Sequence, residues 1–165
     1  MNSDLTENLY AAFPYLYRGH NKPPSESSMY RGFECEDGWH SVLHDLSQEL
    51  TDYRVQHPDV EIEVMQVKQK FGSLRYLAKG VDAATGEMIE RACQRALLTC
   101  ELTGMPGQLC HINRGLLYEG PYMVLCPEKA KELGYTPIFT DPSDLAEFAA
   151  ICSKALLATT PLNLP

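Results

Sequence analysis

The residues with the clearest potential for chemistry are the cysteines in the second half of the chain. Cys100 opens the stretch CELTGMPGQLCH, Cys110 and His111 close it, and Cys126 follows at the end of YMVLC. Zinc prefers thiolate and imidazole ligands, and structural zinc sites use four of them. Thr103, however, stands where a Cys-x-x-Cys pair would be completed. The spacing therefore predicts the outline of a zinc site that lacks part of its ligand set.

Two interpretations of this cluster remain open. Cys100, Cys110, His111 and Cys126 could together form a Cys3His site with zinc as the cofactor. Neighbouring side chains of an extended segment point to opposite faces, so adjacent Cys110 and His111 are poorly arranged to bind one ion. We therefore favour a chain without a metal site or cofactor, in which packing holds the turn together.

A second group of reactive residue types lies before and within a segment of helical spacing: Cys35, Asp37, His40 and His44. The two histidines are one helical turn apart, so they could bind a metal ion or exchange protons. Cys35 and His40 could serve a hydrolase as nucleophile and base, but no oxyanion-hole motif accompanies them. The same helix carries further polar residues: Asp45, Gln48, Glu49 and Asp52. A solvated face explains this pattern better, so we predict no catalytic residues and no enzyme.

The elements that must position these residues follow from hydrophobic periodicity. Apolar residues at helical spacing predict one helix from Asp37 to just before Pro58, and a second helix after DAATGE. Between them, VEIEVMQVKQKFGSLRYLAKG predicts two strands joined by a turn near KFGS. The inward faces of these strands would be formed by two sets of residues: Ile62, Val64 and Gln66, and Leu74, Tyr76 and Ala78.

The remaining segments predict shorter elements. LTENLYAAFPYLY should form a short helix ended by Pro14, with Tyr15 and Tyr17 packed inward. GHNKPPSESSMYRGF is rich in Pro, Gly and Ser and predicts an exposed loop. QLCHI, GLLYEG and YMVLC predict extended pieces, and Pro127 begins a brief helix. A final helix would carry an apolar stripe made of Leu145, Phe148, Ala149, Cys152 and Leu156.

Together these elements predict an α+β fold, in which a small antiparallel sheet packs against two or three amphipathic helices beside a degenerate zinc-knuckle-like segment. We expect one domain over 1–165. It would comprise an N-terminal segment and loop (1–35), a core (36–133) and a C-terminal extension (134–165). The extension could make partner-specific contacts or simply complete the core.

Composition narrows the class of partner. Lys and Arg number 14 against 22 Asp and Glu, a formal net charge of −8, which argues against tracking a nucleic-acid backbone. An acidic surface suits solubility or a basic protein partner. No apolar run approaches the roughly 20 residues that span a bilayer. The first ten residues lack the basic residues of a secretory signal, so we expect no membrane partner and a cytoplasmic location.

Three stretches together resemble a family of small, largely uncharacterised phage and bacterial proteins. They are GFECEDGWHSVLHDL, QVKQKFGSLRYLAKG, and CELTGMPG followed by YMVLC. The family shares an Asp-Gly-Trp helix start, a Lys-x-Lys-Phe-Gly-x-Leu-Arg hairpin and a C-terminal zinc knuckle. The resemblance implies that Cys100 and Cys126 stand on two ligand positions of that knuckle. Thr103 and Lys129 would stand on the other two, and neither is a suitable zinc ligand.

Small size, acidity, the missing catalytic signature and this resemblance favour a non-enzymatic binding protein. We expect an immunity or inhibitor protein that neutralises a basic bacterial toxin, for example a nuclease effector, or a defence component. Its partner-binding residues would be Glu34, Glu36, Asp45, Glu49 and Asp52. The alternative is a zinc-binding accessory protein of phage origin that contacts nucleic acid.

Overall fold

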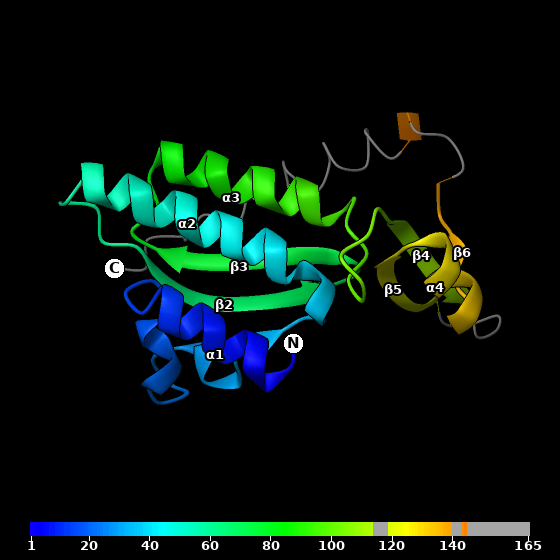
Figure 1. The fold of residues 1–165 in the computed structure, drawn as a ribbon, viewed down its shortest axis with the longest axis horizontal. Helices are drawn as coiled ribbons and strands as arrows, with labels where there is room; N and C mark the ends of the chain where they lie inside the picture. The colour runs from blue at the N-terminus through cyan, green and yellow to red at the C-terminus, as the bar shows by residue number, and fades with distance from the viewer. Residues whose placement is uncertain (114–118, 140–142, 145–165) are drawn as a thin grey trace.

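The computed structural model describes residues 1–113, 119–139 and 143–144, and its architecture is α+β, as predicted. Two helices, α2 (His40–Gln56) and α3 (Ala83–Ala96), lie side by side over the hairpin of β2 (Glu63–Lys70) and β3 (Ser73–Lys79) (Figure 1). The N-terminal segment with α1 (Ser3–Ala12) lies on the β2 side. None of the helices in the described part combines the length and apolar character needed to cross a membrane.

The first sheet has the order β1-β2-β3, in which β1 (Phe33–Glu34) is parallel to β2 and the hairpin is antiparallel. The turn is formed by Phe71 and Gly72, both with positive φ (53° and 74°), which matches the twist of a two-residue hairpin. A register shift between Val64 and Gln66 changes which side chains face the core. Because of it, Val67 is fully buried where Gln66 was predicted.

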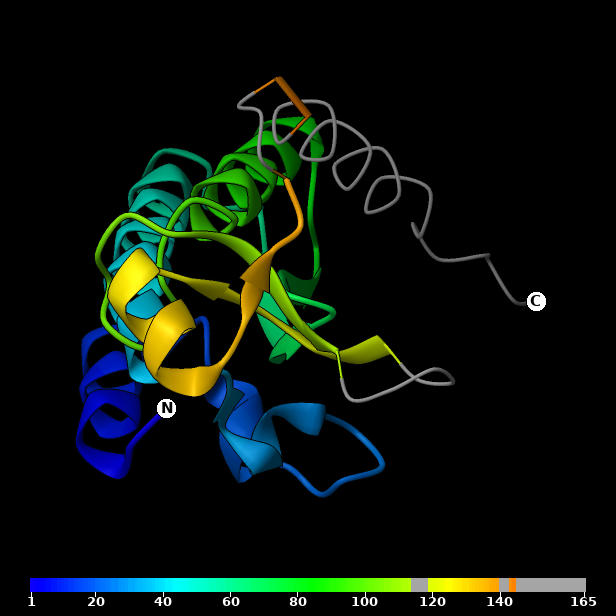
Figure 2. The same ribbon diagram turned by 90° about the vertical axis from the view of Figure 1, so that its right-hand side faces the viewer.

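The second sheet has the order β5-β4-β6 and carries the cysteine region. Its strands are β4 (Gln108–Asn113), β5 (Glu119–Leu125) and β6 (Thr136–Pro137), and the short helix α4 (Pro127–Leu133) follows β5. Figure 2 shows this unit end-on, with α4 in front of the strands. The predicted strands at QLCHI and YMVLC and the predicted helix after Pro127 are confirmed. GLLYEG lies largely outside the described residues.

The helices bury the apolar residues that the periodicity indicates. Trp39, Leu43 and Leu50 are fully buried, and the ring N–H of Trp39 donates to the Thr99 carbonyl at 2.9 Å. A short 3-10 turn, η3 (Asp37–Trp39), precedes α2. Helix α3 begins earlier than predicted, because Asp82 caps it in a reciprocal capping box with Thr85.

The predicted exposed loop between residues 19 and 33 is more ordered and more buried than expected. It contains the 3-10 helices η1 (Arg18–Asn21) and η2 (Ser28–Arg31), and Met29 is fully buried. Tyr17 is buried as predicted, whereas Tyr15 is half-buried under the guanidinium groups of Arg18 and Arg54. One prediction is therefore corrected, because the loop supplies core residues. Tyr15 packs against the core, as predicted, but part of its ring stays at the surface. The predicted final helix lies outside the described residues, apart from 143–144.

Candidate functional site

The segment from Cys100 to Gly104 is a tight turn that anchors the start of α2. Gly38 donates its backbone N–H to the Glu101 carbonyl at 2.7 Å, and Gly104 donates to the Cys100 carbonyl at 2.9 Å. Glu101 in turn donates its N–H to the Val124 carbonyl of β5 at 2.8 Å. The turn thus joins the start of α2 to the second sheet.

Three free cysteines lie in one buried cluster next to this turn. Cys100, Cys110 and Cys126 are buried in one small apolar cluster with Leu125 and Ala130. Burial raises the pKa of Cys110. Burial alone would also raise the pKa of Cys100, but hydrogen bonds from the Thr103 hydroxyl and from neighbouring backbone N–H groups outweigh it and lower that pKa.

The two residues predicted to replace zinc ligands lie beside the thiols. The Thr103 hydroxyl is 3.8 Å from the sulfur of Cys126 and also hydrogen-bonds Cys100. Lys129 pairs with Glu132 at 2.7 Å, which is the main reason that its pKa is raised. The nearby sulfurs of Cys126 and Cys100 add to that shift. Thr103 therefore contacts a cysteine of the cluster, and Lys129 is near enough to two of them to feel their charge. Neither side chain is a suitable zinc ligand.

The wider donor set does not fit one either. Among the residues that the structure describes, no three His, Cys, Asp or Glu side chains are grouped so that they could hold a metal ion. Cys110 lies in the apolar cluster, whereas His111 is half-buried and its ring centre lies 6.4 Å from that of Tyr122. The adjacent pair thus separates as strand geometry requires.

The candidate hydrolase residues are not arranged for catalysis. Burial is the largest cause that raises the pKa of Cys35 to about 12, so its thiol is not a nucleophile near neutral pH. No hydrogen bond joins Cys35 to His40 among the described residues. Burial and the nearby His44 lower the pKa of His40, and the ring of His44 packs edge-on against Phe13 at 5.1 Å. His44 is exposed and His40 is half-buried, which agrees with the predicted solvated face for His44.

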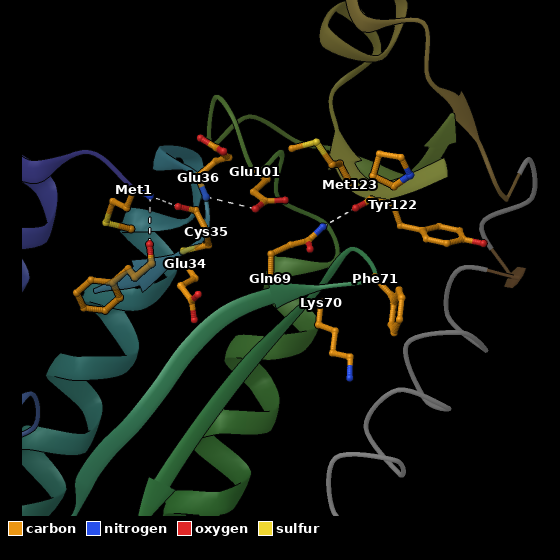
Figure 3. Close-up of a pocket in the computed structure, with 12 residues that line it drawn as sticks. Met1, Glu34, Cys35, Glu36, Gln69, Lys70, Phe71, Glu101, Tyr122 and Met123 are labelled. Atoms are coloured by element: carbon orange, nitrogen blue, oxygen red, sulfur yellow. Dashed lines mark hydrogen bonds between the residues drawn. The ribbon is translucent and has the colours of Figure 1, made fainter. Parts of the chain in front are cut away.

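A cavity of about 670 Å³ opens between the two sheets (Figure 3). One wall is formed by β1 and the residues after it, including Glu34 and Glu36. The β2–β3 turn with Phe71 and the start of β5 with Tyr122 and Met123 form the other walls. The side-chain amide of Gln69 bridges the two sheets by donating to the Tyr122 carbonyl. Acidic and aromatic side chains thus face one space.

Glu101 belongs to this cavity and is its most unusual residue. Its side chain is only 2% exposed, and one carboxylate oxygen accepts from the Glu36 N–H at 3.3 Å. The other oxygen, Oε2, is buried and has no hydrogen-bond partner among the residues that the structure describes. Burial is the main reason that the pKa of Glu101 rises to about 7, and the charge of Glu36 contributes.

This pKa predicts how stability changes with pH. The ordinary pKa of a glutamate is 4.5, so the folded state disfavours the ionised form of Glu101. Below pH 4.5 the carboxyl group is protonated in both the folded and the unfolded state, and its contribution to stability is complete. As the pH rises to about 7, the free energy of unfolding falls by about 3 kcal/mol, because only the unfolded state ionises readily. We expect Glu101→Gln to remove this component when urea unfolding is measured at pH 4.5 and pH 8. Glu128→Gln, an exposed control, should follow the wild type; equal pH slopes for all three proteins would contradict the assignment.

The structure separates the five acids predicted to bind a partner. Glu34 and Glu36 line the cavity, and Glu36 forms no ion pair among the described residues, while Glu34 lies 3.6 Å from Arg31. The three acids of α2 lie elsewhere and have partners of their own: Asp45 with Arg95 at 2.5 Å, Glu49 with Arg91 at 2.9 Å, and Asp52 with Gln48 at 2.8 Å.

Sequence reasoning missed Glu101, Phe71 and Tyr122 as site residues. Nothing in the sequence around Glu101 marks its carboxylate as buried, because its contacts are made with residues far away in the chain, such as Glu36. No family model, curated protein or solved structure matches this chain, so the resemblance stays a prediction and the geometry alone must carry the assignment.

Proposed function

We propose that this chain is a non-enzymatic binding protein of the immunity or inhibitor type, whose partner is a basic bacterial toxin or a defence component. The single observation that carries the proposal is the open cavity in which Glu34 and Glu36 stand beside exposed aromatic surface. Phe71 is 69% exposed there and its ring lies near that of Tyr122, so the two rings give the cavity apolar surface for contact.

The electrostatics of the whole chain support the same partner class. A net charge of −8 attracts a basic surface, and a cavity with low-dielectric walls concentrates that attraction. Aromatic residues are enriched at the centres of protein interfaces, where they supply contact area at low entropic cost. A toxin that acts on nucleic acid must carry a basic groove, so a nuclease effector fits this chemistry.

The inhibitor proposal is favoured over an enzyme because the reactive groups near the cavity are not activated. The Cys35 thiol lines the cavity but is held protonated by its burial. Among the residues described, no hydrogen bond joins this thiol to His40, so the pairing that activates a cysteine nucleophile is missing. What remains is a set of charged and aromatic side chains whose arrangement suits recognition.

The proposal predicts which acids control association. The partner is first captured from the native host with the tagged chain, and association is then measured by stopped flow at two salt concentrations. We expect Glu34→Lys with Glu36→Lys to slow association at low salt by ten-fold or more, because steering depends on local charge. The effect should shrink toward ~0.5 M salt, where screening is strong.

The matched control is Asp59→Lys with Glu61→Lys, which changes the net charge equally on exposed acids away from the cavity. We expect a smaller effect from this pair, and circular dichroism checks that both proteins fold. If both pairs slowed association equally, steering would depend on the net charge of the chain and not on the acids of the cavity. A captured partner without a basic surface would reject the proposal.

A further inference from the structure

We propose that the cavity between the two sheets receives an arginine side chain of the partner, whose guanidinium donates to the buried carboxylate of Glu101. This inference rests on the proposed function and specifies the chemistry of its central contact. The observation behind it is Oε2 of Glu101, which is buried and has no donor within the described part of the chain.

A buried carboxylate oxygen without a donor is unfavourable, because water is removed and no protein group replaces it. In Figure 3 the Glu101 side chain lies on the cavity wall between Glu36 and Met123, and one of its oxygens is bonded to Glu36. The free oxygen has almost no exposed surface, so a donor that enters the cavity can reach it only when the side chains around it move. Met1 and Met123 line the same space, and such unbranched side chains change rotamer easily, so small rotations can uncover the carboxylate.

The surrounding chemistry selects a guanidinium. Glu34 and Glu36 add negative charge to the wall that holds Glu101, which favours a cation over a neutral donor. On the opposite wall, the rings of Phe71 and Tyr122 meet edge to face at 6.4 Å, and both offer aromatic surface to a cation. Arginine combines a planar fork of donors with the ability to stack on rings, whereas lysine offers a compact point charge.

Among the described residues, two cations border the cavity, and neither donates a hydrogen bond to Glu101. The Met1 ammonium donates to the carbonyls of Phe33 and Cys35. It also lowers the pKa of Glu101, although burial outweighs this effect. The Lys70 ammonium lies 5.4 Å from the ring centre of Phe71. Oε2 of Glu101 therefore still lacks a donor within the described part of the chain. The volume of about 670 Å³ lies within the roughly 300–1,000 Å³ of typical ligand pockets, so an arginine side chain can enter.

The first test uses the wild-type chain and needs no partner. N-acetyl-arginine amide, its lysine counterpart and its neutral citrulline counterpart are titrated into labelled protein, and NMR shifts of Met123 and Glu101 are followed. We expect the arginine compound to shift both residues saturably, with an apparent affinity at least five-fold above that of citrulline. Equal responses to arginine and citrulline, or no shift at these residues, would overturn the inference.

The second test uses the captured partner and separates the two proposals. We expect Glu101→Gln to increase the dissociation rate constant ten-fold or more, with little change in association, because loss of a buried charged contact acts on dissociation. Glu101→Asp, which keeps the charge but withdraws the carboxylate, should give a smaller increase, and Glu128→Gln should give none. If Glu101→Gln behaves like Glu128→Gln while the Glu34 and Glu36 reversals still slow association, the arginine site is wrong and the proposed function stands.

Discussion

Replacing Thr103 and Lys129 together by cysteine is expected to give a chain that binds one zinc ion. Thr103 already contacts Cys126, and the Lys129 ammonium is near enough to Cys126 and Cys100 for these residues to raise its pKa. Helix α4 begins directly after its capping residue Cys126, and position 129 lies in its first turn. The double substitution would therefore complete two Cys-x-x-Cys pairs on a backbone that is already folded.

The expected effect on stability is large. Zinc binding to structural sites of this type is worth about 10–16 kcal/mol at neutral pH, and binding to the folded state alone adds to its stability. We expect a zinc-dependent increase in the thermal midpoint of well over 10 °C, and a cobalt-substituted form with the absorption of tetrahedral thiolate ligation. Cys110, whose pKa is raised by burial, should remain a bystander thiol.

The controls decide between this account and the zinc-protein alternative. The wild type should carry less than one equivalent of zinc after mild chelation, and Cys100→Ser in the double variant should abolish binding. One equivalent in the wild type, lost on Cys100→Ser, would show that Thr103 and Lys129 are no obstacle. The zinc-binding accessory protein would then be the better assignment.

The parts of the fold that sequence predicted well are those set by local pattern. The stripe containing Leu43 and Leu50 fixes α2 as a helix, and the alternation around Phe71 and Gly72 fixes the hairpin. The register shift after Val64 was missed, although the adjacent apolar residues Val64 and Met65 interrupt the alternation of VEIEVMQVKQK at that point. Burial of Met29 was also missed, since Pro and Gly mark turns but do not say whether a turn is covered.

The candidate site was predictable only in part, for a physical reason. Glu34 and Glu36 could be selected because acidity is visible residue by residue. The cavity exists because the β2–β3 turn meets the second sheet, through the bond from Gln69 to Tyr122 and the packing of Gly72 against Leu109. Such contacts join residues far apart in the chain, and a one-dimensional pattern does not carry them.

The second large effect is expected from Gly38→Ala, because this glycine lets α2 touch the knuckle backbone. A Cβ at position 38 would lie 2.2 Å from the Cys100 carbonyl oxygen, 2.5 Å from the Gly104 nitrogen and 2.6 Å from the Glu101 carbonyl oxygen. These are backbone atoms, so no side-chain rotation can relieve the overlap. The helix start and the turn must move apart, which breaks the 2.7 Å bond from Gly38 to Glu101 and strains the neighbouring bond from Trp39 to Thr99.

We expect Gly38→Ala to lower the free energy of unfolding by about 4 kcal/mol, at the upper end for a single substitution, when measured by urea denaturation. Gly86→Ala in α3 is the matched control, since its Cβ would meet only a Val81 methyl group at 3.7 Å. There alanine should stabilise the helix by about 0.5–1 kcal/mol. The same chemical change thus has opposite signs at the two sites. If Gly38→Ala changed stability by less than about 1 kcal/mol, the close approach of α2 to the knuckle would be wrong. Glu101, which that contact positions, would then lose its fixed place in the cavity.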